Sequence, residues 1–448
     1  MVDRPIHRIV NLISDDDQQI LNMSVAEARW LLLADDPGAV SRIRGSFALV
    51  ARDGERVCLA RSLNRPLRYF LAKEPDGPML VVADRIDAIS AVLEREGYGE
   101  QFYPMYTRMV PAHYVTEIRL IGCPDPSPTH RRFFDPPRGA LPPDLDGIGG
   151  AYVEALCSEI RLWLDLIEDS EPIGVLFSGG VDSGVVLLCL YHEVLARGQS
   201  PARLKAFTLA VDGGGTDAAQ ARAFLRRVGL QLLGEEIEVP ASALDPLQAV
   251  EVIEDYKPLD VECAAVSLAL LAGIRARYPS WRWLADGDGG DENLKDYPIE
   301  ENPELTIKSV VNNRLLYHEG WGVESLKHSL TYTGGLSRGC VRGYAPAKRF
   351  GFSVFSPHTA PAVVAAAESI PFAELTQGSH ETLYRLKGEV ARRGVRRVLG
   401  CDLPVFPKRR FQHGAVPDEV FGRRFRSEER TYRAHFFGRF HAALRLTA

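Results

Sequence analysis

Short apolar runs separated by turn signals fill the first third of the chain. Residues 45–62, GSFALVARDGERVCLARS, hold two β-forming runs joined by the turn signal Arg52-Asp53-Gly54, and residues 77–85, GPMLVVADR, follow a second turn at Pro75–Gly77. Asp-Gly between apolar runs is typical of a β-hairpin. The pattern therefore predicts a sheet domain with a few helices.

The apolar positions change their period in the second part of the chain, where stretches with helical spacing alternate with strand-like runs. The helical stretches are residues 151–169, 185–198, 217–229 and 267–278, and the strand-like runs are residues 173–177, 204–211, 230–239 and 281–285. Such alternation is typical of a parallel sheet with helices on both faces. We therefore predict a doubly wound α/β domain.

A proline-rich segment separates the two patterns. Residues 123–150 contain repeated proline, which removes amide donors and restricts the residue before it. A chain of 448 residues also has material for more than one hydrophobic core. We therefore predict one domain over residues 1–143 and a second over residues 149–448.

Charge and hydropathy limit the classes of partner that the sequence favours. The net charge is −6 and no long Lys/Arg run occurs, so there is no general electrostatic reason to bind nucleic acid or an anionic membrane. No stretch reaches the ~18 apolar residues of a membrane helix, and the start, MVDRPIHRIVNLISDDD, is acidic where a signal peptide is apolar. We expect a cytoplasmic protein with a small-molecule or peptide substrate, and a homodimer is left open.

The seven cysteines are scattered and never spaced as C-x-x-C. This spacing argues against a zinc knuckle, an iron–sulfur cluster and a disulfide scaffold. Most cysteines sit beside apolar residues, as Cys189 does in VVLLCLY. We expect them to be small buried hydrophobes.

One Gly-rich segment combines hydroxyls and a carboxylate between a predicted strand and a predicted helix. Its residues are Phe177-Ser178-Gly179-Gly180-Val181-Asp182-Ser183-Gly184. Glycines let the backbone approach an anion, and hydroxyls with the free amides of a helix start can hold phosphate oxygens. Asp182 is then placed to bind magnesium. A plain turn would need only small residues, so this combination favours a phosphate site.

The segment resembles the S-G-G-x-D-S PP-loop of ATP pyrophosphatases and lacks the G-x-x-x-x-G-K-[ST] of a Walker ATPase. The resemblance implies cleavage of ATP between its α and β phosphates, with ATP and Mg2+ as cofactors. It also implies an adenine nucleotide α-hydrolase-like fold for the second domain. The residues it assigns to the nucleotide are Phe177, Ser178, Gly179, Gly180, Asp182 and Ser183.

A second segment, residues 284–292 (LADGDGGDE), resembles the S-G-E-G-x-D-E element of asparagine synthetases and β-lactam synthetases. By this match Gly287 joins the nucleotide site and Asp291 is a second magnesium ligand facing Asp182. Asp288 takes the place of the family's catalytic Glu or Tyr. Two carboxylates and a metal can hold the leaving pyrophosphate. Without the PP-loop, the segment would be interpreted as an acidic surface loop.

A third segment, residues 403–411 (LPVFPKRRF), resembles the family's L-P-…-R-x-K-x-x-F stretch, whose lysine reaches the adenylate. The resemblance implies Lys408 as the catalytic cation, because negative charge grows on the acyl oxygen as the amine attacks. Lys387, Arg349 and Arg410 are the alternatives for this role. A basic cluster is otherwise usually a solvated face.

Residues 349–357 have the outline of the family's H-G-L-E-V-R-V-P-F segment. Ser353 and Phe355 stand where the family has Glu and Arg. Those family positions lie close to the acceptor or acyl substrate. We therefore expect a less polar pocket and a substrate other than that of asparagine synthetases.

The N-terminal part resembles class II glutaminase domains in residues 45–50, 59–62 and 65–69. The resemblance implies an Ntn-hydrolase-like sheet domain whose nucleophile is a cysteine directly after the initiator Met. Here position 2 is Val2, and the first cysteine is Cys58. Glutamine hydrolysis needs that thiol beside its own amine, so we expect a degenerate, inactive domain.

Together these resemblances imply a carbon–nitrogen ligase that adenylates a substrate carboxylate for attack by an amine, without glutamine hydrolysis. The product would be a specialised metabolite or peptide with an intramolecular or intermolecular amide. Free ammonia stays open as the amine. The alternatives are a PP-loop sulfur transferase and a non-catalytic scaffold. The identities of the acid and the amine are open as well.

Overall fold

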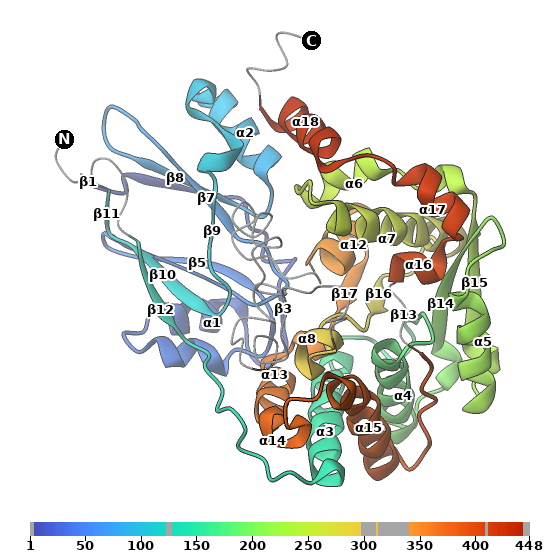
Figure 1. The fold of residues 1–448 in the computed structure, drawn as a ribbon. Coiled ribbons are helices and arrows are strands. Elements are labelled where there is room, and N and C mark those ends of the chain that lie inside the picture. Colours follow the sequence, from blue (N-terminus) through green and yellow to red (C-terminus); the bar gives the residue numbers. More distant parts are fainter. Residues whose placement is uncertain (1–3, 122–127, 297–310, 312–339, 408–410, 442–448) are drawn as a thin grey trace.

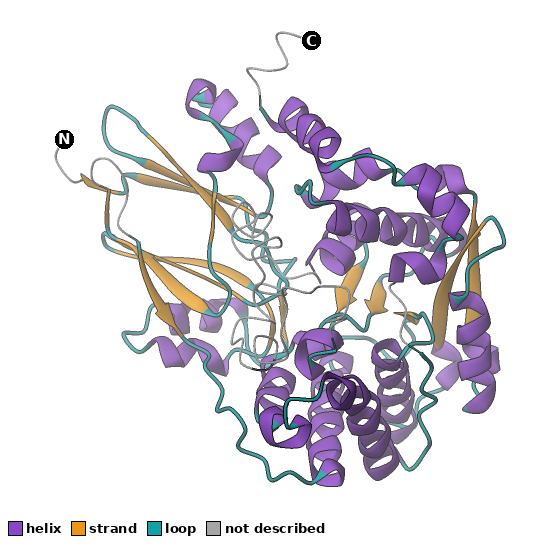
Figure 2. Cartoon of the chain, viewed as in Figure 1, coloured by secondary structure: helices purple, strands orange, loops and turns teal. Residues whose placement is uncertain are grey.

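The computed structural model describes residues 4–121, 128–296, 311, 340–407 and 411–441. Figure 1 shows two antiparallel-rich sheets on one side of the molecule and a parallel sheet wrapped in helices on the other. In Figure 2, strands predominate on the first side and helices on the second. In the part of the chain that the structure describes, no helix is both long and apolar enough to cross a bilayer.

The N-terminal part contains two four-stranded sheets, with strand orders β12-β10-β6-β5 and β2-β8-β7-β9. Their strands are β2 (Arg8–Asn11), β5 (Ala48–Asp53), β6 (Arg56–Arg61), β7 (Arg68–Ala72), β8 (Met79–Ala83), β9 (Arg108–Met109), β10 (Tyr114–Ile118) and β12 (Thr129–Arg132). Two short pairs accompany them, β1 (Arg4–Pro5) with β11 (Leu120–Ile121) and β3 (Gln19–Ile20) with β4 (Gly45–Ser46). The two runs joined at Arg52–Gly54 pair as the hairpin β5–β6, as predicted, and the run after the second turn forms β8, which pairs with β7.

Both faces of these sheets are buried, because successive side chains along a strand belong to different apolar clusters. Val50 and Leu59 belong to the apolar cluster shared with Leu80 of the other sheet. Their neighbours Leu49 and Ala60 pack in a different cluster with helix α1 (Val25–Leu32). Helix α2 (Ile86–Arg95) shares a cluster with β7 and β8 of the second sheet. The period of two along each strand thus builds layers of helix, sheet, sheet and helix.

The second part is built on a five-stranded sheet with the order β15-β14-β13-β16-β17, in which every pairing is parallel. Its strands are β13 (Ile173–Leu176), β14 (Leu204–Val211), β15 (Gly234–Val239), β16 (Trp283–Ala285) and β17 (Ser353–Phe355). The chain runs outward from β13 to β15 and then returns to the other side of β13. The carboxyl ends of β13 and β16 therefore flank a topological switch point, where open α/β sheets bind ligands.

Helices cover both faces of this sheet, as the sequence pattern predicts. One apolar core holds α3 (Leu145–Leu164), α4 (Val181–Ala196), α5 (Asp217–Arg227), α13 (Pro361–Glu368), α14 (Phe372–Thr376) and α15 (His380–Leu399). The other core holds α6 (Pro246–Ile253), α7 (Pro258–Arg277), α12 (Ala345–Arg349), α16 (Phe411–Ala415), α17 (Asp418–Arg424) and α18 (Glu429–Phe440). The short helix α8 (Gly290–Leu294) follows β16.

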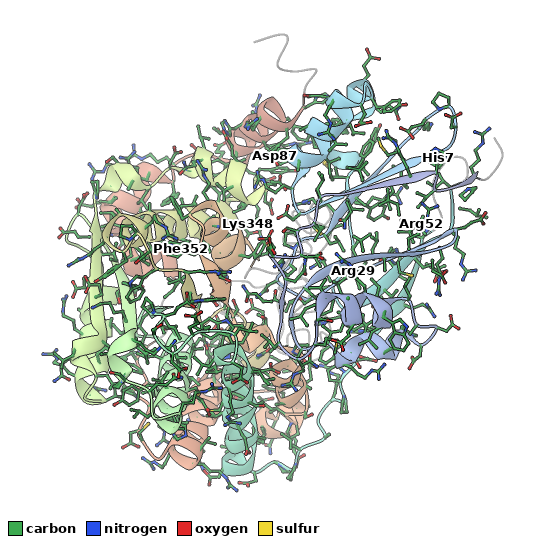
Figure 3. All side chains as sticks on the ribbon, turned by 180° about the vertical axis from the view of Figure 1, so that it is seen from behind. His7, Arg29, Arg52, Asp87, Lys348 and Phe352 are labelled. Carbon is green, nitrogen blue, oxygen red and sulfur yellow. The ribbon has the colours of Figure 1, made fainter. Side chains whose placement is uncertain are left out.

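The two parts share core and ion pairs. Phe70 of β7 lies in one apolar cluster with Phe207 of β14. Lys348 of α12, labelled in Figure 3, donates to Asp17 at 2.8 Å and to Asp84 at 2.6 Å. The domain boundary between residues 143 and 149 stays a prediction. The expected burial of cysteines is confirmed for five of the six described ones, with Cys401 partly buried.

Candidate active site at the carboxyl ends of β13 and β16

The Gly-rich segment forms the predicted turn between β13 and α4. Gly179 has a φ of +74°, and a Cβ there would lie 2.7 Å from the Ala221 nitrogen, so only glycine fits. The Ser178 hydroxyl accepts from the Gly180 amide at 3.3 Å and lies 3.4 Å from the Ser183 hydroxyl. The turn therefore presents two hydroxyls at the amino end of a sixteen-residue helix, where an anion is favoured.

The second segment packs directly on this turn. A Cβ on Gly287 would lie 2.6 Å from the Ser183 nitrogen, and one on Gly290 would lie 2.2 Å from the Asp182 Oδ1. Both positions therefore need glycine for the two loops to touch. Close contact between the loops brings the carboxylates of Asp182 and Asp291 to a common point.

That point is occupied by the ammonium of Lys387 from α15. Its Nζ lies 2.6 Å from Asp182 Oδ2 and 3.4 Å from Asp296 Oδ2, and it also donates to Asp291 Oδ1. Burial acts to lower the pKa of Lys387, but the three carboxylates raise it well above its usual value. The residue is 5 % exposed, so a charged ammonium is held between acidic groups inside the protein.

Sequence reasoning named Lys387 only as an alternative cation. The signal that could have found it is its position on the apolar face of α15, among the buried Leu383, Leu386 and Val390. A lysine on such a face is rarely fully buried unless it is paired. Its partners come from segments about a hundred and two hundred residues away, which no local pattern reveals.

Lys408 and Arg410 lie outside the described residues. Val405, Phe406 and Pro407, just before them, line the same cavity as Lys387. Arg349 is an exposed residue at the end of α12. The assignment of the catalytic cation to Lys408 stays a prediction.

Asp288 lines the cavity and is paired with an arginine. Its Oδ1 lies 3.4 Å from Arg342 Nη1, and its amide donates to Asp286 Oδ1 at 3.1 Å. Burial and the neighbouring Asp288 raise the pKa of Asp286 well above its usual value. Arg342 belongs to the π-helical turn η8 (Cys340–Tyr344), a rare conformation that is frequent at functional sites. Sequence reasoning assigned a role to neither Asp286 nor Arg342.

A buried network holds the backbone of the turn from behind. His358 Nε2 lies 3.3 Å from the carbonyl oxygen of Asp182, and its Nδ1 lies 2.8 Å from the Tyr152 hydroxyl. Burial lowers the pKa of His358 to about 4, so the ring is neutral at pH 7. Because a carbonyl only accepts, Nε2 carries the proton and Nδ1 accepts from Tyr152. Asn293 donates to the Tyr152 hydroxyl and to the His358 carbonyl, which closes the network.

The cavity around these groups has a volume of about 1750 Å3, larger than a drug-sized pocket of roughly 300–1,000 Å3. The residues assigned to the nucleotide that line it are Phe177, Ser178, Gly180, Asp182, Ser183 and Gly287. Gly179 shapes the turn. The volume is sufficient for a nucleotide together with a second substrate.

Ser353 and Phe355, on which the prediction of a less polar pocket rests, do not line the cavity, and that prediction stays a prediction. Phe355 stacks on Trp163 in the core, with ring centroids 4.9 Å apart, and Ser353 accepts from Gln19 at 2.7 Å. The cavity is instead lined by several charged side chains, including Glu262, Asp288 and Arg385. The aromatic replacement therefore fills the core and does not set the polarity of the cavity.

The carboxylates suit a magnesium ion that shares its ligands with phosphate. Among the described residues, no group of three His, Cys, Asp or Glu side chains is arranged to hold a metal. Magnesium in nucleotide sites is commonly bound by one or two carboxylates, with phosphate oxygens and water as the other ligands. Asp182 and Asp291, meeting beside the α4 amides, fit this donor set, and their metal role stays a prediction.

Comparison with known proteins finds a match to one family model. Residues 165–334 match the family model described as asparagine synthase, a range that includes the Gly-rich turn, β16 and the segment Asp286–Glu292. No curated protein matches the chain significantly. The matched range begins after the N-terminal sheets, so the glutaminase-like interpretation of those sheets stays a prediction.

Proposed function

We propose that this chain adenylates a substrate carboxylate for attack by an amine, because residues 165–334 match the model of the asparagine synthase family, a family of ATP-dependent ligases. The family makes carbon–nitrogen bonds with release of AMP and pyrophosphate. The finer proposal concerns the acid, the source of the amine and the residues that act.

The observation that carries the proposal is the meeting of Asp182, Asp291 and Lys387 in front of the α4 amino terminus. Helix amides and the hydroxyls of Ser178 and Ser183 would bind the phosphates that become pyrophosphate. Bound Mg2+ would neutralise charge on the leaving phosphates. A scaffold without catalysis would have no need for a buried lysine among three carboxylates, since such groups are costly to bury.

Arg342 and Asp288 suit the second half of the reaction. Asp288 would accept the proton of the attacking amine, and the guanidinium of Arg342, 3.4 Å away, would hold that carboxylate in place. Burial and the neighbouring Asp288 raise the pKa of Asp286 beside them, which favours its neutral form and reduces the repulsion between the two acids. Lys408 is proposed as the cation that stabilises the developing oxyanion.

We infer that the amine does not come from glutamine. The first cysteine of the chain, Cys58, is buried within β6, and burial raises the pKa of its thiol to about 11. A thiol in this state is a poor nucleophile at neutral pH. Val2 lies outside the described residues and offers no thiol. The amine is thus part of the acid substrate, a second molecule, or free ammonia.

Isotope transfer tests the proposal. The protein would be incubated with ATP, Mg2+ and pools of carboxylic acids labelled with 18O in the carboxylate, and the nucleotide products would be analysed by mass spectrometry. AMP that carries one 18O, together with pyrophosphate, is the expected result, because adenylation leaves one carboxylate oxygen on AMP. ADP and phosphate would contradict the reaction class, and AMP formed only with a sulfur donor and a nucleic acid would favour sulfur transfer.

A further inference from the structure

Lys387 lies between the two carboxylates, Asp182 and Asp291, that are proposed to hold the metal ion. Its Nζ is 2.6 Å from Asp182 Oδ2 and donates also to Asp291 Oδ1. A magnesium ion held by the same two oxygens would stand about 2.1 Å from each. The ammonium and a bridging ion therefore compete for the same oxygens.

The fold holds the ammonium in this position. Helix α15 packs so closely on α3 that a Cβ on Gly394 would lie 2.2 Å from the carbonyl oxygen of Gly149. The aliphatic stem of Lys387 lies on the same buried face of α15 as Leu383 and Val390. Packing fixes the stem, so a change of partners can only involve the ammonium at its end.

The charges around the ammonium define what can replace it. Asp182, Asp291 and Asp296 carry three negative charges, and Lys387 compensates one of them within 3.4 Å. A free divalent ion that binds between Asp182 and Asp291 meets the repulsion of this cation at short range. A nucleotide brings the triphosphate, which attracts the ammonium toward the α4 turn and supplies further oxygens for the ion.

We propose that Lys387 is a built-in counter-cation that makes divalent-ion binding at Asp182 and Asp291 depend on the nucleotide. Without nucleotide, the ammonium keeps the two carboxylates together and excludes a free ion. With nucleotide, it transfers its hydrogen bonds to phosphate oxygens, and the ion takes the carboxylates. This inference rests on the proposed function, because it assumes a nucleotide at the α4 turn.

Manganese binding followed by electron paramagnetic resonance tests this. Free Mn2+ would be titrated into the wild type, with and without a nonhydrolysable α,β-methylene analogue of ATP, and into Lys387→Met without nucleotide. We expect weak binding to the free wild type, tight binding with the analogue, and about tenfold or more tighter binding of free Mn2+ to Lys387→Met than to the wild type. Lys387→Arg keeps the charge and should not gain this affinity.

Arg396→Met is the matched control, because Arg396 lies on the same helix and pairs only with the exposed Asp402 among the described residues. It should bind Mn2+ as the wild type does. If the wild type binds free Mn2+ as tightly as it does with the analogue, the inference is wrong, even where Lys387→Met fails to fold. Equal free-Mn2+ affinity in a folded Lys387→Met and the wild type would also overturn it. A wild type that binds no analogue would instead overturn the proposed function and, with it, the nucleotide dependence.

Discussion

Gly290→Ala should separate the chemistry of the site from the stability of the fold. A Cβ at this position would lie 2.2 Å from Asp182 Oδ1 and 2.4 Å from its Cγ, whereas ordinary contact begins at 3.4 Å. The carboxylate must therefore retreat by roughly 1 Å or more, and a displacement of this size in a reacting group can reduce the rate about a hundredfold. Gly290 has no left-handed backbone, so alanine adds no φ strain.

We expect Gly290→Ala to change the free energy of unfolding less than it changes the activation free energy. The whole Asp182 side chain has to shift, because its Oδ1, Cγ and Cβ would lie 2.2, 2.4 and 3.0 Å from the added Cβ, and overpacking of this kind costs about 1–3 kcal/mol. We expect the free energy of unfolding to fall by about 1 kcal/mol, while the activation free energy rises by about 2.7 kcal/mol for a hundredfold slower reaction.

The assay is ATP–pyrophosphate exchange with the acid that the wild type turns over, combined with urea unfolding of the same preparation. Gly438→Ala in α18 is the control, because nothing lies within 4 Å of its added Cβ. It should keep normal exchange and gain about 0.4–1 kcal/mol of stability. Normal exchange in Gly290→Ala would show that the Asp182 carboxylate does not act in the position described.

Two further substitutions and one activity assay test other parts of the molecule. Gly394→Ala should lower the free energy of unfolding by about 1–3 kcal/mol in urea, since its Cβ would press on α3, and an unchanged value would contradict that packing. Burial raises the pKa of Asp255 to about 7, so the native state binds its proton more tightly than the unfolded chain, and stability falls as pH rises from about 4 to 7. Asp255→Asn should flatten this fall in urea titrations at several pH values, and an unaltered slope would refute the assignment. Incubation with glutamine should yield no enzyme-dependent glutamate, whose appearance would overturn the interpretation of Val2.

Local pattern was sufficient for strands β13, β14, β15 and β16 of the parallel sheet and for the turn between β13 and α4. The run at residues 204–211 is β14 to the residue, because eight consecutive mostly apolar positions of a buried parallel strand leave little choice. Helix α3 begins at Leu145, earlier than its apolar spacing indicates, because Asp144 caps it by accepting from the amides of Asp146 and Gly147. That capping aspartate is a signal in the sequence that the periodicity alone does not use.

The contacts that hold the site residues in place could not be predicted, because they join segments that are far apart in the sequence. Lys387 meets Asp182 across 205 residues, and His358 meets Tyr152 across 206. Strand β17 has only three residues and belongs to the sheet through its pairing with β16. A single lysine or histidine forms no pattern along the sequence, and its role depends on which groups the fold places around it.

The most direct test of the central claim is a crystal structure with Mg2+ and the α,β-methylene analogue of ATP. The account predicts the triphosphate on the amides and hydroxyls of residues 178–183, with a magnesium ion between Asp182 and Asp291 and the Lys387 ammonium on phosphate oxygens. A nucleotide bound elsewhere in the molecule, or one bound at this turn with no metal at either aspartate, would contradict it.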